Sequence, residues 1–186
     1  MDSEQLCREL VRDVAAVIHD EHEFLRKARQ AAEALGSESI EVMAKMFHDE
    51  PSPPPELADR FPGLGNWIAA RQFAIFEIFY NLGESALPVL RRVAFGEYDW
   101  TQGNAIEVLC RLAANGIQRD SIVAEIQREF PKLRYEAQLY AVGPILKQAE
   151  TNSQLANVLA EFEVVPEYRE IVEELTREFE NDNLMT

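Results

Sequence analysis

Two histidines and a glutamate near the amino terminus are best suited, by type and spacing, to bind a metal. In the segment His19-Asp-Glu-His22-Glu23, a helix would place His22 one turn after His19 and Glu23 four residues after it. Imidazole and carboxylate groups are ligands that zinc and other divalent ions accept. His22 also falls in the gap of an apolar stripe between Ile18 and Leu25, where a hydrogen-bonded core histidine is the more ordinary outcome. A metal-binding or enzymatic protein is therefore the alternative hypothesis.

The rest of the sequence carries no catalytic motif. Acidic pairs such as Asp49–Glu50 and Glu173–Glu174 are expected by chance in a chain with 33 acidic side chains. The sequence has no glycine-rich phosphate loop, no nucleophile elbow and no Cys–His pairing. We expect a protein that is not an enzyme, with no cofactor and no metal site.

Aromatic residues point instead to binding. Tyr98, Asp99 and Trp100 stand together in a segment, 97–104, that separates two predicted helices. Large aromatic side chains dominate the energetics of many protein interfaces, so we predict that this segment contacts a partner. Trp67 is the weaker candidate, because it is better explained by packing under the proline-rich run 51–55.

The carboxyl-terminal segment has the densest negative charge. Residues 161–186 contain 9 acidic and 2 basic side chains. The acids on the predicted last helices are Glu161, Glu163, Glu167, Glu170, Glu173, Glu174 and Glu178. This is either a solvated helix face or a surface for a basic protein, and we select Glu170 and Glu174 as candidate partner contacts.

Composition sets wider limits. The chain has 186 residues, 47% of them apolar, and a formal charge of −15, which disfavours nucleic acid and anionic lipid and favours basic partners. Cys7 and Cys110 each fall on the apolar side of a predicted helix and read as small buried hydrophobes. The amino terminus lacks a basic region followed by an apolar stretch, and nothing approaches the ~18 apolar residues of a membrane span. We expect a cytoplasmic protein.

Apolar residues at three-and-four spacing predict helices along most of the chain, and no stretch has the period-two alternation of a strand. One long helix is predicted over 3–35. A proline-rich run, 51–55, then blocks helix formation. The remaining predicted helices cover 38–48, 67–82, 84–95, a segment capped by Asp99 that ends at 114, 120–130, 133–148 with a kink at Pro144, 154–162, and a last one from 166.

A short pattern recurs three times in the middle of the chain. Its alanines are Ala74, Ala105 and Ala137, which stand 31 and 32 residues apart, and a polar residue lies three positions before each one (Arg71, Gln102 and Arg134). A period in this range is typical of stacked helical repeats.

These residues resemble the HEAT-repeat family of α-solenoids. The likeness rests on Ala70-Arg71 with Ala74, Asp99 with Ala105, and Leu133-Arg134 with Ala137, and covers roughly 66–162. In this pattern, the arginine ties neighbouring repeats by reaching an acid or a carbonyl. The chain departs from the pattern at Gln102, which stands where arginine is expected, and at Pro144.

The resemblance implies an all-α fold: a right-handed α-α superhelix of helical hairpins with about eight or nine helices. We expect a single domain, 1–186, made of an amino-terminal helical cap (1–50), a proline-rich linker (51–65), three helix pairs (66–162) and an acidic cap helix (163–186). The resemblance also places Arg91 and Arg92 on the concave side of the stack, as further candidate contacts.

The favoured hypothesis is a non-catalytic, protein-binding solenoid. Its most concrete form is suggested by a likeness to small acidic HEAT-like bacterial proteins: an immunity protein that binds and neutralises a basic toxin, such as a nucleic-acid enzyme. We expect no direct contact with nucleic acid or membrane. Besides the metal-binding alternative, a scaffold that associates with itself through its caps stays open.

Overall fold

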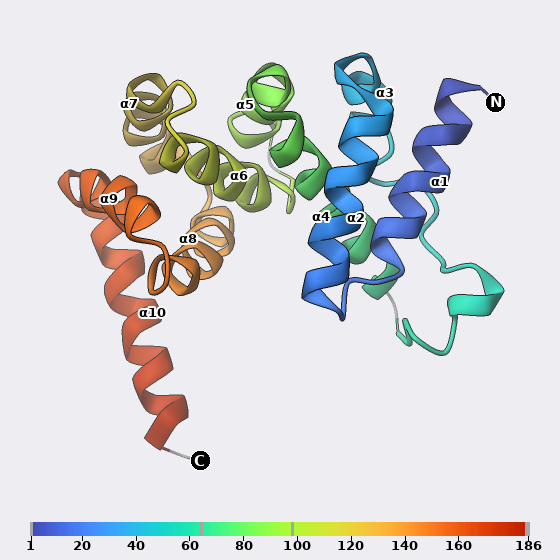
Figure 1. Cartoon of the computed structure of the whole chain (residues 1–186). Coiled ribbons are helices and arrows are strands. Elements are labelled where there is room, and N and C mark those ends of the chain that lie inside the picture. The colour runs from blue at the N-terminus through green and yellow to red at the C-terminus, as the bar shows by residue number, and fades with distance from the viewer. Residues whose placement is uncertain (1, 64, 98, 185–186) are drawn as a thin grey trace. The chain divides into compact units, whose positions relative to one another are not determined.

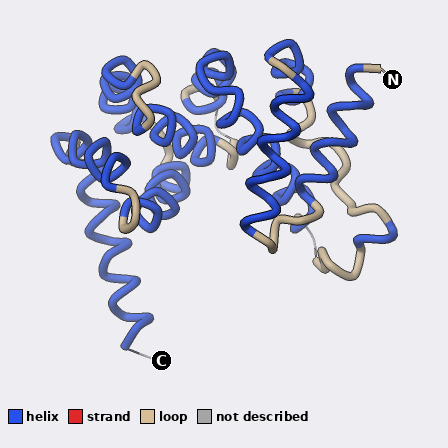
Figure 2. Tube along the Cα trace, in the orientation of Figure 1, coloured by secondary structure: helices blue, strands red, loops and turns tan. Residues whose placement is uncertain are grey.

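The computed structural model of the protein describes residues 2–63, 65–97 and 99–184, and only the backbone of 178–184. Across these residues the chain is 76% helical and has no strand (Figure 2). The predicted all-α class is confirmed. The chain divides into two compact units, Met1–Val89 and Leu90–Thr186. The proline-rich segment 51–65, predicted to be a linker, lies inside the first unit and includes the short 3-10 helix Pro55–Leu57.

In the first unit, α1, α2 and α4 each pack against the other two, and α3 packs against α1 and α4 (Figure 1). Three helices therefore share one core. The helices are α1 (Ser3–Ala15), α2 (Glu21–Leu35), α3 (Ile40–Ala44) and α4 (Asn66–Leu82), with 3-10 helices at Ser37–Ser39, Pro55–Leu57 and Gly83–Ala86.

The prediction of one helix over 3–35 is wrong, because the chain turns between α1 and α2. The side chain of Asp20 accepts a hydrogen bond from the backbone N–H of Glu23 at 3.0 Å, which caps a new helix. The apolar stripe keeps its spacing across the turn, which is why periodicity alone joined the two helices. Gly36, with φ of 67°, follows the last residue of α2, Leu35, where the predicted helix also ends.

Helix α4 is buried almost all round, as its apolar composition predicted. Phe76 stacks on Phe47 with ring centroids 4.9 Å apart, and Phe79 meets Phe47 edge-on at 6.2 Å. At the start of the helix, buried Trp67 packs edge-on against Phe61 at 5.0 Å. The segment that follows the proline run thus helps to cover Trp67.

A buried arginine holds the chain where α3 leads into the proline-rich segment. Arg71 is 0% exposed, and its Nη1 donates a hydrogen bond to the backbone oxygen of Asp49. Its Nε lies 3.8 Å from a carboxylate oxygen of Glu50, and Arg8 pairs with the Asp49 carboxylate at 2.8 Å. Burial lowers the pKa of Arg71, against the opposing effect of Glu50 and Asp49. Arg71 thus reaches a carbonyl and an acid, as expected, but both belong to the 49–50 segment and not to a predicted neighbouring repeat.

In the second unit, α6 packs against α7, α8 and α9, while α8 also packs against α9 and α10 (Figure 1). Two helix pairs, α6 with α7 and α8 with α9, are followed by one long helix. Helix α5 crosses the division between the units, and α8 is continuous through Pro144. The helices are α5 (Leu87–Ala94), α6 (Gln102–Ala114), α7 (Arg119–Glu129), α8 (Tyr135–Ala149), α9 (Ser153–Glu161) and α10 (Pro166–Leu184), with 3-10 helices at Phe130–Lys132 and Phe162–Val164.

Small residues let α6 and α8 approach closely. A Cβ added at Gly103 would lie 2.7 Å from the backbone carbon of Tyr140 and 2.7 Å from its Cβ. Ala105 and Ala137 are also buried in this unit, at 0% and 1% exposure. Two of the recurring alanines are thus buried in the core of the second unit.

Buried amide side chains donate hydrogen bonds to backbone carbonyl groups at or near helix ends. Gln102, at the start of α6, donates from Nε2 to the carbonyls of Ala94 at 3.3 Å and Gly96 at 3.2 Å. Gln138 in α8 donates to the carbonyl of Phe130 at 2.9 Å. Gln102, which departs from the arginine of the HEAT pattern, therefore still reaches carbonyls.

One apolar stretch, Asn66–Ala94, is long enough to span a membrane by length and composition alone. In its most apolar window, 56% of the residues are buried inside the protein, as in a core helix, so the resemblance to a span is weak.

Candidate functional site

The predicted metal ligands do not come together. His19 lies in the turn before α2, where its ring stacks on Phe61 at 5.6 Å, whereas His22 and Glu23 lie in the first turn of α2. His22 is exposed, so its interpretation as a core histidine is also wrong. The carboxylate of Glu23 accepts a hydrogen bond from Nε of Arg26 at 2.7 Å, which lowers its pKa. Among the described residues, no group of three His, Cys, Asp or Glu side chains is placed to hold a metal ion.

Both cysteines are buried free thiols, as predicted. Burial raises the pKa of Cys7, and it raises that of Cys110 far more, with a smaller contribution from the nearby charge of Glu107. A neutral, inaccessible thiol is neither a nucleophile nor a metal ligand.

The residues of the predicted aromatic segment 97–104 differ in what they contact. Tyr98 lies outside the described residues. The carboxylate of Asp99 accepts a hydrogen bond from the backbone N–H of Thr101 at 2.8 Å. The cap residue of α6 is Thr101, so the predicted cap at Asp99 is wrong. Trp100 is 44% exposed and is available for contact.

The two candidate arginines of α5 differ as well. Nε of Arg91 donates to the Glu125 carboxylate of α7 at 2.7 Å, and its Nη2 donates to Gln118 and Ser121 at 3.2 Å. Arg91 thus ties two helices of the second unit together. Arg92 is exposed.

The acidic helix predicted from the sequence is α10. Its acidic side chains lie beside the stripe of the helix that is buried. Tyr168, Ile171 and Leu175 form its buried stripe. Beside that stripe, Glu167, Glu170 and Glu174 are spaced three and four residues apart, so they share one side of the helix. We call these three residues the acidic flank. Glu170 is exposed, and the other two are half-buried.

An exposed tyrosine borders the acidic flank. Tyr135, the first residue of α8, is 48% exposed, and its hydroxyl donates a hydrogen bond to the carboxylate of Glu174. The acidic flank therefore lies beside an exposed tyrosine, a residue type that is enriched among the energetically dominant residues of protein interfaces.

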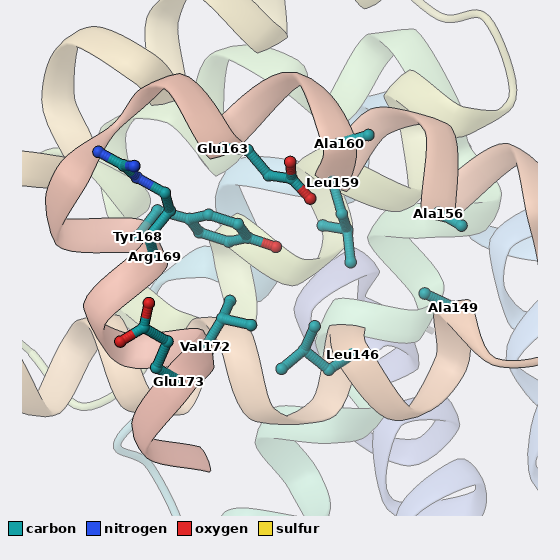
Figure 3. A pocket seen from close by; sticks show the side chains of 10 residues that line it. All are labelled: Leu146, Ala149, Ala156, Leu159, Ala160, Glu163, Tyr168, Arg169, Val172 and Glu173. Atoms are coloured by element: carbon teal, nitrogen blue, oxygen red, sulfur yellow. The ribbon is translucent and has the colours of Figure 1, made fainter. Parts of the chain in front are cut away.

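On the other side of the buried stripe, α8, α9 and α10 line a cavity of about 420 Å³ that is open to solvent (Figure 3). We call it the α8–α10 cavity. It is lined by Leu146, Ala149, Ala156, Leu159, Ala160, Glu163, Tyr168, Arg169, Val172 and Glu173.

The wall of this cavity is mostly aliphatic, with one buried phenol. Figure 3 shows the Tyr168 ring reaching toward Leu159, with Glu163 on one side and Val172 on the other. Burial raises the pKa of Tyr168, and the nearby negative charge of Glu163 raises it further. The hydroxyl is therefore neutral and suited to a hydrogen bond, not to acid–base catalysis at neutral pH.

The sequence did not predict this cavity. Ala149, Ala156 and Ala160 leave it open because they are small, yet alanine is also the residue most expected in any helix. The detectable signal was the charge on its rim, since Glu163 and Glu173 belong to the acidic segment already noted.

No protein-family model, no curated protein and no solved structure matches this chain.

Proposed function

We propose that the chain is a non-catalytic, protein-binding helical module that holds a basic protein against the acidic flank of α10. The observation that carries the proposal is the pairing of that flank with exposed Tyr135, whose hydroxyl donates to Glu174. A chain with a formal charge of −15 attracts a basic partner over a distance and repels polyanions.

The architecture that we propose for this module is HEAT-like. Support comes from the second unit, where two helix pairs lie in succession and Ala105 and Ala137 are both buried in its core. On this proposal α10 seals the apolar end of the stack, as terminal helices of solenoids must, and its outward side is left for binding. The amino-terminal residues 1–50 would cap the other end.

In its most concrete form, the proposal is an immunity or inhibitor protein for a basic bacterial toxin. Toxins that act on nucleic acid need a positively charged surface, and an acidic helix that covers such a surface would block access of the substrate. Electrostatic steering would make association fast at low salt and much slower at high salt.

The test is capture of the partner from the native cell with tagged protein, followed by affinity measurement on the purified pair. We expect a basic partner whose affinity falls steeply with added salt. Charge reversal at exposed Glu170 (Glu170→Lys) should weaken binding about 10-fold or more, since it replaces an attraction by a repulsion.

Glu56→Lys is the matched control, because Glu56 is exposed, lies in the first unit and changes the net charge equally. Equal affinity of the Glu170→Lys and Glu56→Lys proteins would remove the acidic flank from the interface. A partner that is acidic, or whose affinity does not change with salt, would contradict the proposal as a whole.

A further inference from the structure

The α8–α10 cavity has a chemistry that the acidic flank lacks. Its floor and walls come from aliphatic side chains of three helices, such as Leu146, Leu159 and Val172. Its volume of about 420 Å³ lies within the ~300–1,000 Å³ typical of ligand pockets. Ala160 stands at the exposed edge, so the cavity opens to solvent at α9.

The charges at the rim favour a cation. Glu163, Arg169 and Glu173 are all exposed and all line the opening, which gives two carboxylates for one guanidinium. The excess of carboxylates would repel an apolar group that has a negative charge next to it. It would attract an apolar group that has a positive charge next to it.

The cavity and the acidic flank lie within reach of one partner. Glu173, on the rim of the cavity, and Glu170, on the acidic flank, are three residues apart on α10 and are therefore neighbours on its exposed surface. A single helix is about 10–12 Å wide, so a helix of a partner that lies along α10 can touch both.

We propose that the α8–α10 cavity is the anchor site for one aliphatic side chain, of leucine or methionine size, presented on a basic amphipathic helix of the protein partner. The flanking lysine or arginine of that helix pairs with Glu173. The Tyr168 hydroxyl at the cavity wall is placed to hydrogen bond with a polar atom next to the anchor. This inference rests on the proposed function and adds to it the chemistry of the partner: an aliphatic anchor one helical turn from a cation.

The experiment uses the full chain and two synthetic peptides of the same composition. The first is a fluorescein-labelled 18-residue peptide of leucine and lysine with leucines at three-and-four spacing, and the second has the same residues in an order that gives no apolar face. Binding is measured by fluorescence anisotropy at low and at moderate salt.

The variant Ala160→Phe fills the cavity from its exposed edge, and Gln154→Phe, at an exposed position on the opposite side of α9, adds the same side chain away from it. We expect the amphipathic peptide to bind wild-type protein, and Ala160→Phe to weaken it about tenfold, as when one leucine-sized side chain loses its burial. Gln154→Phe should bind as wild type, and the scrambled peptide should bind all three proteins equally weakly.

Methyl resonances give a second readout that does not depend on a variant. Saturating amphipathic peptide should shift the methyl signals of Leu146, Leu159 and Val172 in the wild-type protein and leave those of Val11 and Val14 in α1 unmoved.

The results separate the two proposals. Unchanged affinity of Ala160→Phe together with unmoved cavity methyls would overturn the anchor site, and weaker binding by Glu170→Lys in the same assay would leave the acidic flank supported. Equal binding of both peptides, or none by the amphipathic peptide, would also overturn the anchor site. Shifts of the cavity methyls by a neutral apolar molecule such as benzene, without any by the peptide, would assign the cavity to a small ligand instead.

Discussion

At the scale of single residues, Arg71 is unusual because it is a buried arginine with few hydrogen bonds. Within the described residues, its Nε and Nη2 have no hydrogen-bond partner, although Nη1 donates to the Asp49 carbonyl. A buried guanidinium that is only partly satisfied both costs desolvation and fixes the chain beside it. Glu50, which faces it, has a φ of 50° that few residues other than glycine adopt. Arg71 therefore serves the geometry of the 49–50 segment.

We predict that Arg71→Ala lowers the free energy of unfolding by roughly 2–4 kcal/mol, because it leaves a cavity and removes the bond to Asp49. Arg71→Met should cost less, since it fills the space without a buried charge. Chemical unfolding measures both, with Arg29→Ala on the exposed side of α2 as the control, where the change should stay within ~0.5 kcal/mol. If Arg71→Ala behaves like that control, the buried arginine does not stabilise the first unit.

Cys110 gives a prediction about alkaline pH. Its folded pKa is raised, so the folded state favours the neutral thiol, while the unfolded chain ionises near pH 8.5. The contribution of Cys110 to the free energy of unfolding is fully present below about pH 8.5. Above that pH it falls by ~1.4 kcal/mol per pH unit, because the unfolded chain loses the thiol proton and the folded chain keeps it. Urea unfolding at pH 8, 9 and 10 should show this loss, and Cys110→Ala should reduce its slope. A slope unchanged by Cys110→Ala would show that this thiol ionises equally in both states.

At the scale of helices, close approach of α6 and α8 organises the second unit. Gly103 admits the backbone of Tyr140, which a Cβ would meet at 2.7 Å. By contrast, a Cβ at Gly143 in α8 would meet only Leu175 Cδ1, at the ordinary distance of 3.9 Å.

We therefore predict that Gly103→Ala destabilises the protein by about 1–3 kcal/mol, the cost of overpacking, despite the better helix propensity of alanine. Gly143→Ala should stay within ~1 kcal/mol of wild type, because its gain in propensity is opposed by crowding against Pro144. Thermal unfolding of the two variants checks the difference. Equal stability of the two would mean that α6 and α8 do not meet at Gly103.

Most helix ends were predictable within a few residues, but the turn between α1 and α2 was not, and the helix predicted over 38–48 is α-helical only over Ile40–Ala44. Gly36, Gly83 and Gly116 all have positive φ and stand at or beside helix ends, as their residue type predicted. The turn between α1 and α2 was missed although Asp20 and Glu23 have the spacing of a capped helix start. The apolar stripe continued across them, and burial, which would have outweighed the periodicity, is not visible in the sequence.

At the scale of the whole molecule, the distribution of charge could be predicted from the sequence, whereas the position of a cavity could not. The acidity of α10 follows from counting residues, but the α8–α10 cavity arises only when three helices pack and small side chains such as Ala156 and Ala160 coincide. The same limit explains the metal hypothesis: His19, His22 and Glu23 have a helical spacing, yet the turn at 16–20 places them on different elements.

The molecule thus presents a nonpolar cavity and a negative surface on neighbouring sides of α10, both within the second unit. The first unit has its own core around α4, so it can serve as an internal reference in any experiment that measures binding to the second unit.

The most direct test of the central claim is amide hydrogen exchange on the complex of the full chain with its captured partner, compared with the unbound protein. We predict slower exchange in 133–140 and 166–177, the segments that carry Tyr135 and the acidic flank, and no change in α1 and α2. Slower exchange confined to residues 2–63, with none in α10, would contradict the claim that this helix binds the partner.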